Sequence, residues 1–199
     1  MFNSPEEESR VDIWPSVVDM RFLQRNIHPY QCSYTELKSY FHDDGFHGPD
    51  GFVVPYPVFV KTQHKAISHV VENKHDFGHL GVYGMHTEYF VGEVIDIAED
   101  DIGKREFRTY IAGGRAINAA RMWQDYDDCE IPVGLLDFAQ SFATHHAPHF
   151  QTYGLDIAEL TDGSFAVIEL NSLSRAGRYF GNKFEPILSA FIDTATKKD

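Results

Sequence analysis

Alternation of apolar and polar residues predicts the first clear strand of this chain at residues 57–61 (PVFVK). Successive side chains of a strand point to opposite faces, so the valines of this run share one face, and Phe59 and Lys61 share the other. A second strand is predicted over residues 88–97 (EYFVGEVIDI), followed by an acidic loop. The two runs indicate a sheet with one apolar face and a lysine at the end of a strand.

Residues 153–171 (YGLDIAELTDGSFAVIELN) predict a β-hairpin, because two apolar runs flank an Asp-Gly pair that favours a tight two-residue turn. With that loop length Asp156 lies directly opposite Glu169, and Asn171 points to the same face two residues further on. Opposed Cβ atoms are roughly 4.5–5.5 Å apart, and like charges at that separation repel each other. The arrangement favours a cation between the two carboxylates, unless the strand ends lie in water that screens them.

Residues 105–123 (REFRTYIAGGRAINAARMW) predict a second hairpin around a Gly-Gly turn. In the predicted register Glu106 is opposite Arg121. Arg108 is opposite Ala119 and points to the same face, while the other face of the hairpin is mostly apolar. Arginine on a rigid strand suits bidentate recognition of phosphate or carboxylate. The alternative is an exposed ladder of ion pairs without a binding role.

Helices are predicted where apolar residues recur every three or four positions. This spacing occurs in residues 131–148 (IPVGLLDFAQSFATHHAP), and a terminal helix is predicted after Pro186. Residues 34–41 (YTELKSYF) predict one or two helical turns, with Ser33 or Thr35 as the N-cap.

Most of residues 11–56 shows no clean period and is predicted to be irregular, and residues 63–86 remain without an assignment. The assigned elements follow the order strand, strand, hairpin, helix, hairpin, helix. Hairpins make a sheet antiparallel, so the predicted fold class is α+β, a mostly antiparallel sheet with packed helices.

Composition restricts the classes of function. The formal net charge of −13 argues against the basic surface of a protein that binds duplex nucleic acid. The two cysteines, Cys32 and Cys129, lack a CxxC spacing, so neither a structural zinc site nor a disulfide framework is expected. Neither a secretory signal pattern nor an apolar run long enough to cross a membrane occurs, so we expect a cytoplasmic protein without a membrane partner.

The candidate chemistry depends on oxygen-bearing and cationic side chains. Asp156, Glu169 and Asn171 offer only oxygen ligands, which indicates a hard cation such as Mg²⁺. This ion commonly binds one or two carboxylates together with substrate phosphates. Lys61 could hold a nucleotide phosphate as a point charge, or could extend its ammonium group to water.

The same motifs, in this order, resemble the ATP-grasp superfamily: a strand ending in lysine (PVFVK), a strand entering a linker (YFVGEVIDI), an EFR hairpin and a D…ExN hairpin. The chain is most similar to a compact, divergent branch that is common in bacteria and phages and is marked by one arginine and two lysines. The resemblance covers residues 53–185. It implies an ATP-grasp domain at 53–199, with a smaller subdomain at 53–97 and a larger one at 98–199. Residues 1–52 would be the reduced remnant of a preceding domain.

The resemblance also implies a role for each matching residue. Lys61 and Lys65 would bind the nucleotide phosphates. The implied hinge, whose backbone meets the adenine, consists of Glu93, Val94 and Ile95. The implied groups at the transferred phosphoryl group or the acyl-phosphate are Arg108, Arg121 and Arg175. The implied magnesium ligands are Asp156, Glu169 and Asn171.

The implied activity is that of an ATP- and Mg²⁺-dependent ligase, which joins a small-molecule or peptide carboxylate to an amine or thiol through an acyl-phosphate. Two alternatives keep the fold: a kinase that phosphorylates a hydroxyl group, and a nucleotide-binding module without turnover. The chain departs from the family pattern because TQHKAISHVVEN, after the first lysine, contains no glycine-rich loop. A homodimer is left open.

Eleven histidines leave a different kind of metal site as an alternative. His75 and His79 are four residues apart, and other histidines follow along the chain. These are His86, His145, His146 and His149. Imidazole and carboxylate ligands could bind iron or zinc, as in an oxygenase or a hydrolase. The glycine within HDFGH interrupts the helical frame that would bring His75 and His79 together.

Overall fold

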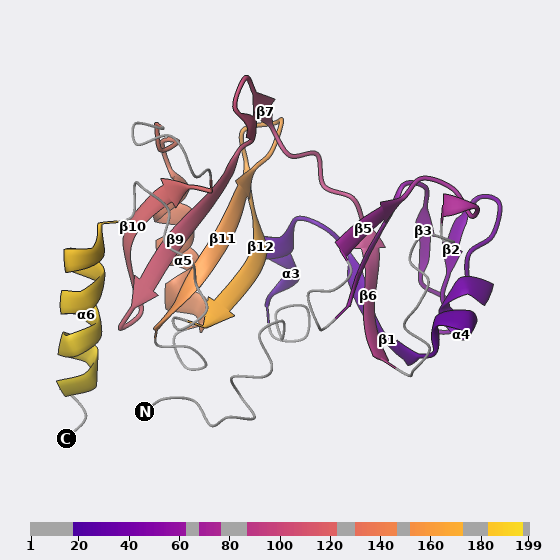
Figure 1. Cartoon of the computed structure of the whole chain (residues 1–199), viewed down its shortest axis with the longest axis horizontal. Helices are drawn as coiled ribbons and strands as arrows, with labels where there is room; N and C mark the ends of the chain where they lie inside the picture. Colours follow the sequence, from indigo (N-terminus) through magenta and orange to yellow (C-terminus); the bar gives the residue numbers. More distant parts are fainter. Residues whose placement is uncertain are drawn as a thin grey trace. The chain divides into compact units, whose positions relative to one another are not determined.

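The chain forms two compact units (Figure 1). The computed structural model describes residues 18–62, 68–76, 87–122, 130–146, 152–172 and 183–196. The small unit is built on Arg25–Ile95 and the large unit on Asp96–Asp199, to which Phe22–Gln24 also belong. The chain therefore passes between the two units before Arg25 and again after Ile95.

The small unit contains a four-stranded antiparallel sheet in the order β1-β6-β4-β5. Its strands are β1 Ile27–Cys32, β6 Thr87–Glu93, β4 Val58–Thr62 and β5 Ser68–Val71. Val58 and Val60 are fully buried in a hydrophobic core that also contains Val91. The predicted strand at PVFVK and its apolar face are thereby confirmed, with Lys61 on the opposite face.

A short helix and a pair of short strands complete the small unit. α4 spans Tyr34–Ser39, and β2 Gly45–His47 pairs with β3 Val53–Pro55. Ser33 caps α4, because its hydroxyl accepts a hydrogen bond from Glu36 N while the Glu36 carboxylate accepts one from Ser33 N. This capping box decides between the two predicted caps, Ser33 and Thr35, in favour of Ser33.

Replacing Ser33 with alanine should lower the free energy of unfolding by about 1 kcal/mol, because the first turn of α4 loses the acceptor for Glu36 N. Thr35→Ala is the matched control. Thr35 is exposed on the same turn, and its loss should cost less than about 0.5 kcal/mol. Urea unfolding followed by circular dichroism measures both variants. Equal losses would contradict the assignment of the cap.

Strand β1 shows that the irregular structure predicted for most of residues 11–56 is wrong, because β1 forms an edge of the small sheet beside β6. Its sequence, IHPYQC, hides the alternation. Tyr30 and Cys32 are buried, but polar residues and Pro29 interrupt the pattern. Proline is tolerated on an edge strand. The segment from β1 to residue 53 thus belongs to the small unit, and its origin as the remnant of a preceding domain stays a prediction.

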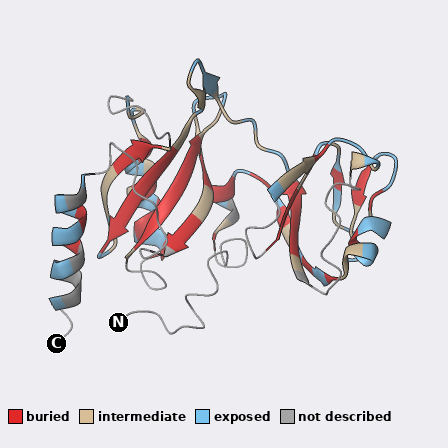
Figure 2. Ribbon diagram, viewed as in Figure 1, coloured by how far each residue is buried: buried red, intermediate tan, exposed pale blue. Residues whose placement is uncertain are grey.

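The large unit is a four-stranded antiparallel sheet in the order β10-β9-β11-β12, packed against two helices (Figure 1). Its strands are β7 Glu99–Asp100, β8 Gly103–Lys104, β9 Glu106–Ala112, β10 Arg115–Arg121, β11 Thr152–Glu159 and β12 Phe165–Ser172. Its helices are α5 Leu135–His146 and α6 Phe184–Thr196. Strands β9 and β11 are buried along almost their whole length (Figure 2). No helix in the described part of the chain is long and apolar enough to cross a membrane.

Helix α5 confirms the helix predicted within residues 131–148. It contacts β9 and β10 with a buried face that includes Phe142. Phe22, from the short helix α3 (Met20–Leu23), packs edge-on against this helix. Its ring centroid lies 5.2 Å from that of Phe142 and 5.7 Å from that of Phe138. The aromatic group thus ties α3 to the core of the large unit.

Two element ends differ from prediction. α6 begins at Phe184, so Pro186 lies within its first turn rather than before it. A proline is accommodated there because the first N–H groups of a helix have no intrahelical acceptor. β6 ends at Glu93 rather than at residue 97.

The turn between β11 and β12 also differs from prediction. Leu160 N donates to Ser164 O at 2.8 Å, so the loop contains the three residues 161–163 instead of two. Gly163 adopts a φ of +81°, a left-handed conformation that glycine takes without strain. The side chain of Asp162 accepts hydrogen bonds from Ser164 and closes the turn.

A β-bulge corrects the effect of this longer loop on the pairing of β11 with β12. Near the turn Ile157 pairs with Val167, one residue away from the predicted register. Ile168 is then skipped, and Asp156 pairs with Glu169. The predicted opposition of the two acids is therefore confirmed, although the turn that was expected to produce it is different.

The hairpin of β9 and β10 follows the predicted register only near its Gly-Gly turn, where Arg115 pairs with Ala112. The register shifts by one residue between Ala116 and Asn118, which makes Ile117 a bulge. Neither glycine nor proline marks the position in the sequence.

The bulge moves Arg121 to the other face of the sheet. Arg121 lies opposite Phe107, and Arg108 lies opposite Ala120. Because opposed residues share a face and neighbours alternate, Arg121 and Arg108 point to opposite sides. The two predicted pairs are wrong: Glu106–Arg121 and Arg108–Ala119.

Candidate active site

Three adjoining strands of the large sheet carry one row of charged residues. Asp156 of β11 is directly opposite Arg108 of β9 on one side and Glu169 of β12 on the other. Directly opposed side chains share a face of the sheet. Asn171 lies two residues beyond Glu169, and Glu106 two residues before Arg108, so both extend the row. We call these five residues the charged face.

A buried, bidentate ion pair between Arg108 and Asp156 lies at the centre of the charged face. Arg108 Nε donates to Asp156 Oδ1 at 2.7 Å, and Nη2 donates to Oδ2 at 2.6 Å. Asn171 Nδ2 donates to the same Oδ2 at 3.0 Å. Only 5% of Arg108 and 1% of Asp156 is exposed. Paired charge-assisted hydrogen bonds of this length fix the plane of the guanidinium group.

The titration of Glu106 reflects the negative charge of this face. Burial raises the pKa of its carboxyl group above the ordinary value. Lys104 opposes the rise, and the charges of Asp156 and Glu169 add to it. Carboxylates that raise one another's pKa stabilise a cation that binds among them.

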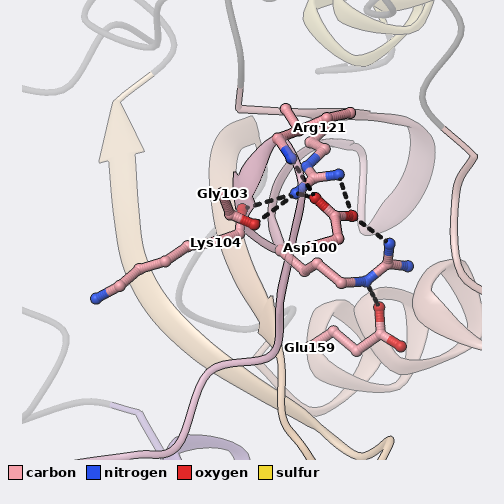
Figure 3. Close-up of polar contacts among 7 residues, drawn as sticks. Asp100, Gly103, Lys104, Arg121 and Glu159 are labelled. Atoms are coloured by element: carbon pink, nitrogen blue, oxygen red, sulfur yellow. Dashed lines mark hydrogen bonds and ion pairs between the residues drawn. The ribbon is translucent and has the colours of Figure 1, made fainter.

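Arg121 belongs to a different network, on the face away from Arg108 (Figure 3). Its Nη1 and Nη2 donate to the two carboxylate oxygens of Asp100 at 2.6 and 2.7 Å. Nη2 also donates to the backbone oxygen of Gly103 at 2.8 Å. The hydrogen bond from Arg121 lowers the pKa of Asp100 strongly. Because Asp100 and Gly103 belong to β7 and β8, Arg121 pins this hairpin to the sheet.

Arg105 extends the same network to the end of β11. Its Nε donates to Glu159 Oε2 at 2.6 Å, and its Nη1 donates to Asp100 Oδ2 at 3.1 Å. The hydrogen bond to Glu159 raises the pKa of the guanidinium group. β9 thus separates two sets of charges: Arg105 and Arg121 hold the β7–β8 hairpin, whereas Arg108 faces the carboxylates of the charged face.

Lys61 lies in the small unit, on the face of β4 opposite to the hydrophobic core. The register sets it between Ser68 of β5 and Phe90 of β6, and only 6% of it is exposed. A second cation is close to this strand, since Arg25 Cζ lies 4.3 Å from the centroid of the Phe59 ring. Burial lowers the pKa of Arg25 to about 10. Two cations on one buried face suit an anionic ligand.

The predicted hinge follows directly after β6. Glu93 Oε2 accepts hydrogen bonds from Asn26 N at 2.8 Å and from Asn26 Nδ2 at 3.1 Å, and Glu93 N donates to Asn26 O. These contacts occupy the side chain of Glu93 and tie the two passages of the chain at the edge of the small unit. Val94 is exposed and Ile95 is half-buried. Two other predicted residues lie outside the described residues: Lys65 and Arg175.

A family model matches residues 53–183, and it describes an ATP-grasp domain, the second family of its clade. The chain belongs to this family. The predicted superfamily and fold class are therefore confirmed. The matched part of the ATP-grasp domain starts just before β4, which carries Lys61, and includes both hairpins of the charged face.

Solved structures share the ATP-grasp fold at low sequence identity. N5-carboxyaminoimidazole synthase from Aspergillus clavatus, in complex with ADP and 5-aminoimidazole ribonucleotide, is 13% identical with a TM-score of 0.62 over 93% of this chain and 52% of that chain. The ATP-grasp ligase PsnB, complexed with minimal precursor, Mg and ADP, is 17% identical with a TM-score of 0.56 over 98% and 62%. A RimK domain protein from Sphaerobacter thermophilus is 12% identical with a TM-score of 0.54 over 95% and 68%. This chain thus spans 52% and 62% of the first two proteins. A comparison with the curated proteins found no match.

The donor atoms of this ATP-grasp domain fit a magnesium ion. Glu169 and Asp156 provide carboxylate oxygens and Asn171 an amide oxygen, all on the charged face. Mg²⁺ prefers oxygen ligands and commonly completes its octahedron with water and substrate phosphates. The set is therefore suited to an ion that arrives with a nucleotide.

The histidine alternative gains no support from the described part of the ATP-grasp domain. His146 is buried at the end of α5, where its ring stacks on Phe142 with centroids 4.2 Å apart and its Nδ1 lies 3.0 Å from Phe142 O. Among the described residues, no three His, Cys, Asp or Glu side chains are placed to hold a metal ion. Of the histidines considered for this site, three lie outside these residues: His79, His86 and His149.

Sequence reasoning missed the network of Asp100, Arg105 and Glu159. The acidic loop AEDDIGK lies beside the basic pair KR, so a charge pattern was present. Its buried partner, Arg121, could be recognised only with the bulge in β10 known.

Proposed function

We propose that this protein is an ATP- and Mg²⁺-dependent ligase, which joins a carboxylate to an amine or thiol through an acyl-phosphate. The observation that carries the proposal is the charged face, where Arg108, Asp156, Glu169 and Asn171 meet across three strands of an ATP-grasp domain. Acyl-phosphate chemistry needs positioning and charge neutralisation more than a nucleophile from the protein. A face with an oriented guanidinium group and several oxygen donors supplies both.

Arg108 is the group that we place at the transferred phosphoryl group. Its bond to Asp156 fixes the guanidinium plane, so the N–H donors that Asp156 does not use have a defined direction. Donors that are oriented before the reaction stabilise developing charge without a cost of reorganisation. In the proposed step the substrate carboxylate attacks the γ-phosphorus in line, ADP leaves, and Arg108 compensates charge on the phosphoryl oxygens.

The divalent ion is assigned to the D…ExN hairpin. When bound, Mg²⁺ would neutralise oxygens of the β- and γ-phosphates. Glu169 supplies a charged oxygen and Asn171 an amide oxygen for it, and Asp156 completes the group.

The remaining nucleotide contacts are proposed from the family resemblance. Lys61 is assigned to the α- and β-phosphates, because it is a buried point charge on a face that also carries Arg25. Lys65 is assigned a second phosphate contact and Arg175 a contact to the acyl-phosphate. The adenine is assigned to the backbone of residues 93–95.

Arg121 is not part of the proposed site. Its donors bind Asp100 and two backbone oxygens of β8, on the side of the sheet away from Arg108. We assign it the support of the β7–β8 hairpin.

The acid is proposed to be a small molecule or a peptide. Both classes occur among the structural neighbours: PsnB is complexed with precursor peptide PsnA2, and the Aspergillus clavatus synthase with 5-aminoimidazole ribonucleotide. The nucleophile would be an amine or a thiol that displaces phosphate from the acyl-phosphate.

The proposal predicts that ATP is consumed only when Mg²⁺ and a suitable carboxylate are present, and that hydroxylamine traps the acyl-phosphate as a hydroxamate. Lys61→Ala should weaken ATP binding by about tenfold or more, because a charge-assisted contact to phosphate is lost. Lys74→Ala is the matched control in the same unit, since Lys74 forms an exposed ion pair with Asp43 and should leave ATP affinity unchanged. Calorimetric titration with a non-hydrolysable ATP analogue measures both variants.

The same assay separates the alternatives. Release of ADP with a phosphorylated hydroxyl product and no hydroxamate would identify a kinase. Binding of ATP without turnover, across a panel of carboxylates and amines, would identify a nucleotide-binding module. An ATP affinity that Lys61→Ala leaves unchanged would remove this lysine from the site.

A further inference from the structure

The contacts of Asp156 indicate a division of roles within the charged face. We propose that Asp156 is a positioning residue, which holds Arg108 and Asn171, and that the divalent ion is bound by Glu169 and by Asn171 Oδ1. This inference rests on the proposed function and assigns the parts of its metal and phosphoryl site.

The carboxylate of Asp156 has little acceptor capacity left for a metal ion. A carboxylate offers roughly four lone-pair sites. Three N–H groups already donate to them: Arg108 Nε to Oδ1, and Arg108 Nη2 and Asn171 Nδ2 to Oδ2. The residue is almost completely buried. A metal ion that took the oxygens of Asp156 would have to displace donors that are already in place.

Charge also disfavours an ion on Asp156. Arg108 neutralises Asp156 at contact distance, and both lie in a buried, weakly screened environment. A divalent ion on Asp156 would lie close to the guanidinium group, and the two cations would repel each other strongly. Glu169, directly across from Asp156 on β12 and half-buried, offers its carboxylate without this direct competition. The ion is therefore favoured on the β12 side of the row.

The Asn171 amide is oriented by the same carboxylate. Its Nδ2 donates to Asp156 Oδ2, which directs the carbonyl oxygen of the same amide away from Asp156. Amide oxygens are good ligands for hard cations. Asn171 stands two residues after Glu169 on the same face, so one strand presents both ligands. Asp156 thus orients a phosphoryl-binding arginine and a metal-binding amide at once.

The test is the affinity of Mn²⁺ for the full-length protein in the presence of AMPPNP, measured by electron paramagnetic resonance. Glu169→Gln should weaken Mn²⁺ binding by about tenfold or more, whereas Asp156→Asn should weaken it by less than about threefold. Asp156→Asn should also weaken AMPPNP more than ADP, by about fivefold, because a loosened Arg108 loses its contact to the γ-phosphate. Glu159→Gln, on the other face of β11, should change neither value.

A second measurement needs no variant and decides alone if Asp156→Asn does not fold. In ¹⁵N-labelled protein the Arg108 Nε–H signal should keep its position when Mg²⁺ and AMPPNP are added, because its bond to Asp156 persists. A shift of this signal to that of a solvent-exposed arginine, or equal losses of Mn²⁺ affinity in Asp156→Asn and Glu169→Gln, would overturn the positioning role alone. A wild-type protein that binds no Mn²⁺ with AMPPNP would overturn the proposed function and this inference with it.

Discussion

Arg108→Met should lower the free energy of unfolding of the large unit by about 3–5 kcal/mol, because the carboxylate of Asp156 then remains buried without its cationic partner. Methionine fills much of the same space, so the loss reflects an uncompensated charge rather than a cavity. Water cannot replace the guanidinium group at a side chain that is almost fully buried. Hydrogen exchange at the amides of β9 and β11 under native conditions reports this unit separately from the small one.

A double variant tests the cause of that loss. Arg108→Met combined with Asp156→Leu should recover most of the stability, since a buried ion pair can often be replaced by apolar residues of similar volume. Arg105→Met is the matched single variant from the same segment, because the Arg105–Glu159 pair is partly exposed and should cost less. If Arg108→Met were as stable as the wild-type protein, or the double variant weaker than either single one, the buried pair would not be the cause.

Glu169→Gln should reduce ATP turnover by at least about 100-fold while leaving the fold intact, because the site loses its charged metal ligand but keeps a side chain of equal size. Glu169 is half-buried on β12, and its neighbours along the strand, including Leu170, pack without reference to its charge. Steady-state ATP consumption measures the loss, and thermal unfolding by circular dichroism checks the fold.

Glu185→Gln serves as the control for this change. Glu185 is exposed in the first turn of α6, so the same substitution there should leave turnover unaltered. Added Mg²⁺ at high concentration should restore part of the activity of Glu169→Gln, since weaker binding is compensated by mass action. Full activity of Glu169→Gln at ordinary Mg²⁺ concentrations would exclude this residue as the ligand.

The opposition of Asp156 and Glu169 could be predicted from the sequence, but partly for a wrong reason. The Asp-Gly signal locates the turn correctly and gives its length incorrectly, because the loop continues over residues 161–163. The bulge at Ile168 then moves the register back by one residue. Two deviations of one residue cancel, and the acids meet as expected.

No such cancellation occurs in the other hairpin. The bulge at Ile117 has no compensating change, so Arg121 turns away from Arg108. A slip of one residue transfers every following side chain to the other face of a strand, because the period of a strand is two. The position of a bulge depends on packing between strands, which a pattern along one strand does not contain.

Strand β1 illustrates a second limit. Its residues have weak strand preference, with a proline in the middle, and become a strand because β6 offers an edge to pair with. Strongly periodic elements, such as α5 and β4, could be predicted because their own burial decides their structure.

The passages of the chain between its units have a consequence for cutting the molecule in two. Phe22 precedes the small unit along the chain, yet its ring packs against Phe138 and Phe142 in the large unit. A backbone break between Ile95 and Asp96 would leave an N-terminal fragment that still carries this aromatic plug for its C-terminal counterpart. The junction is therefore a suitable split point for fragment complementation, in which reassembly of the two pieces reports that the proteins fused to them have met.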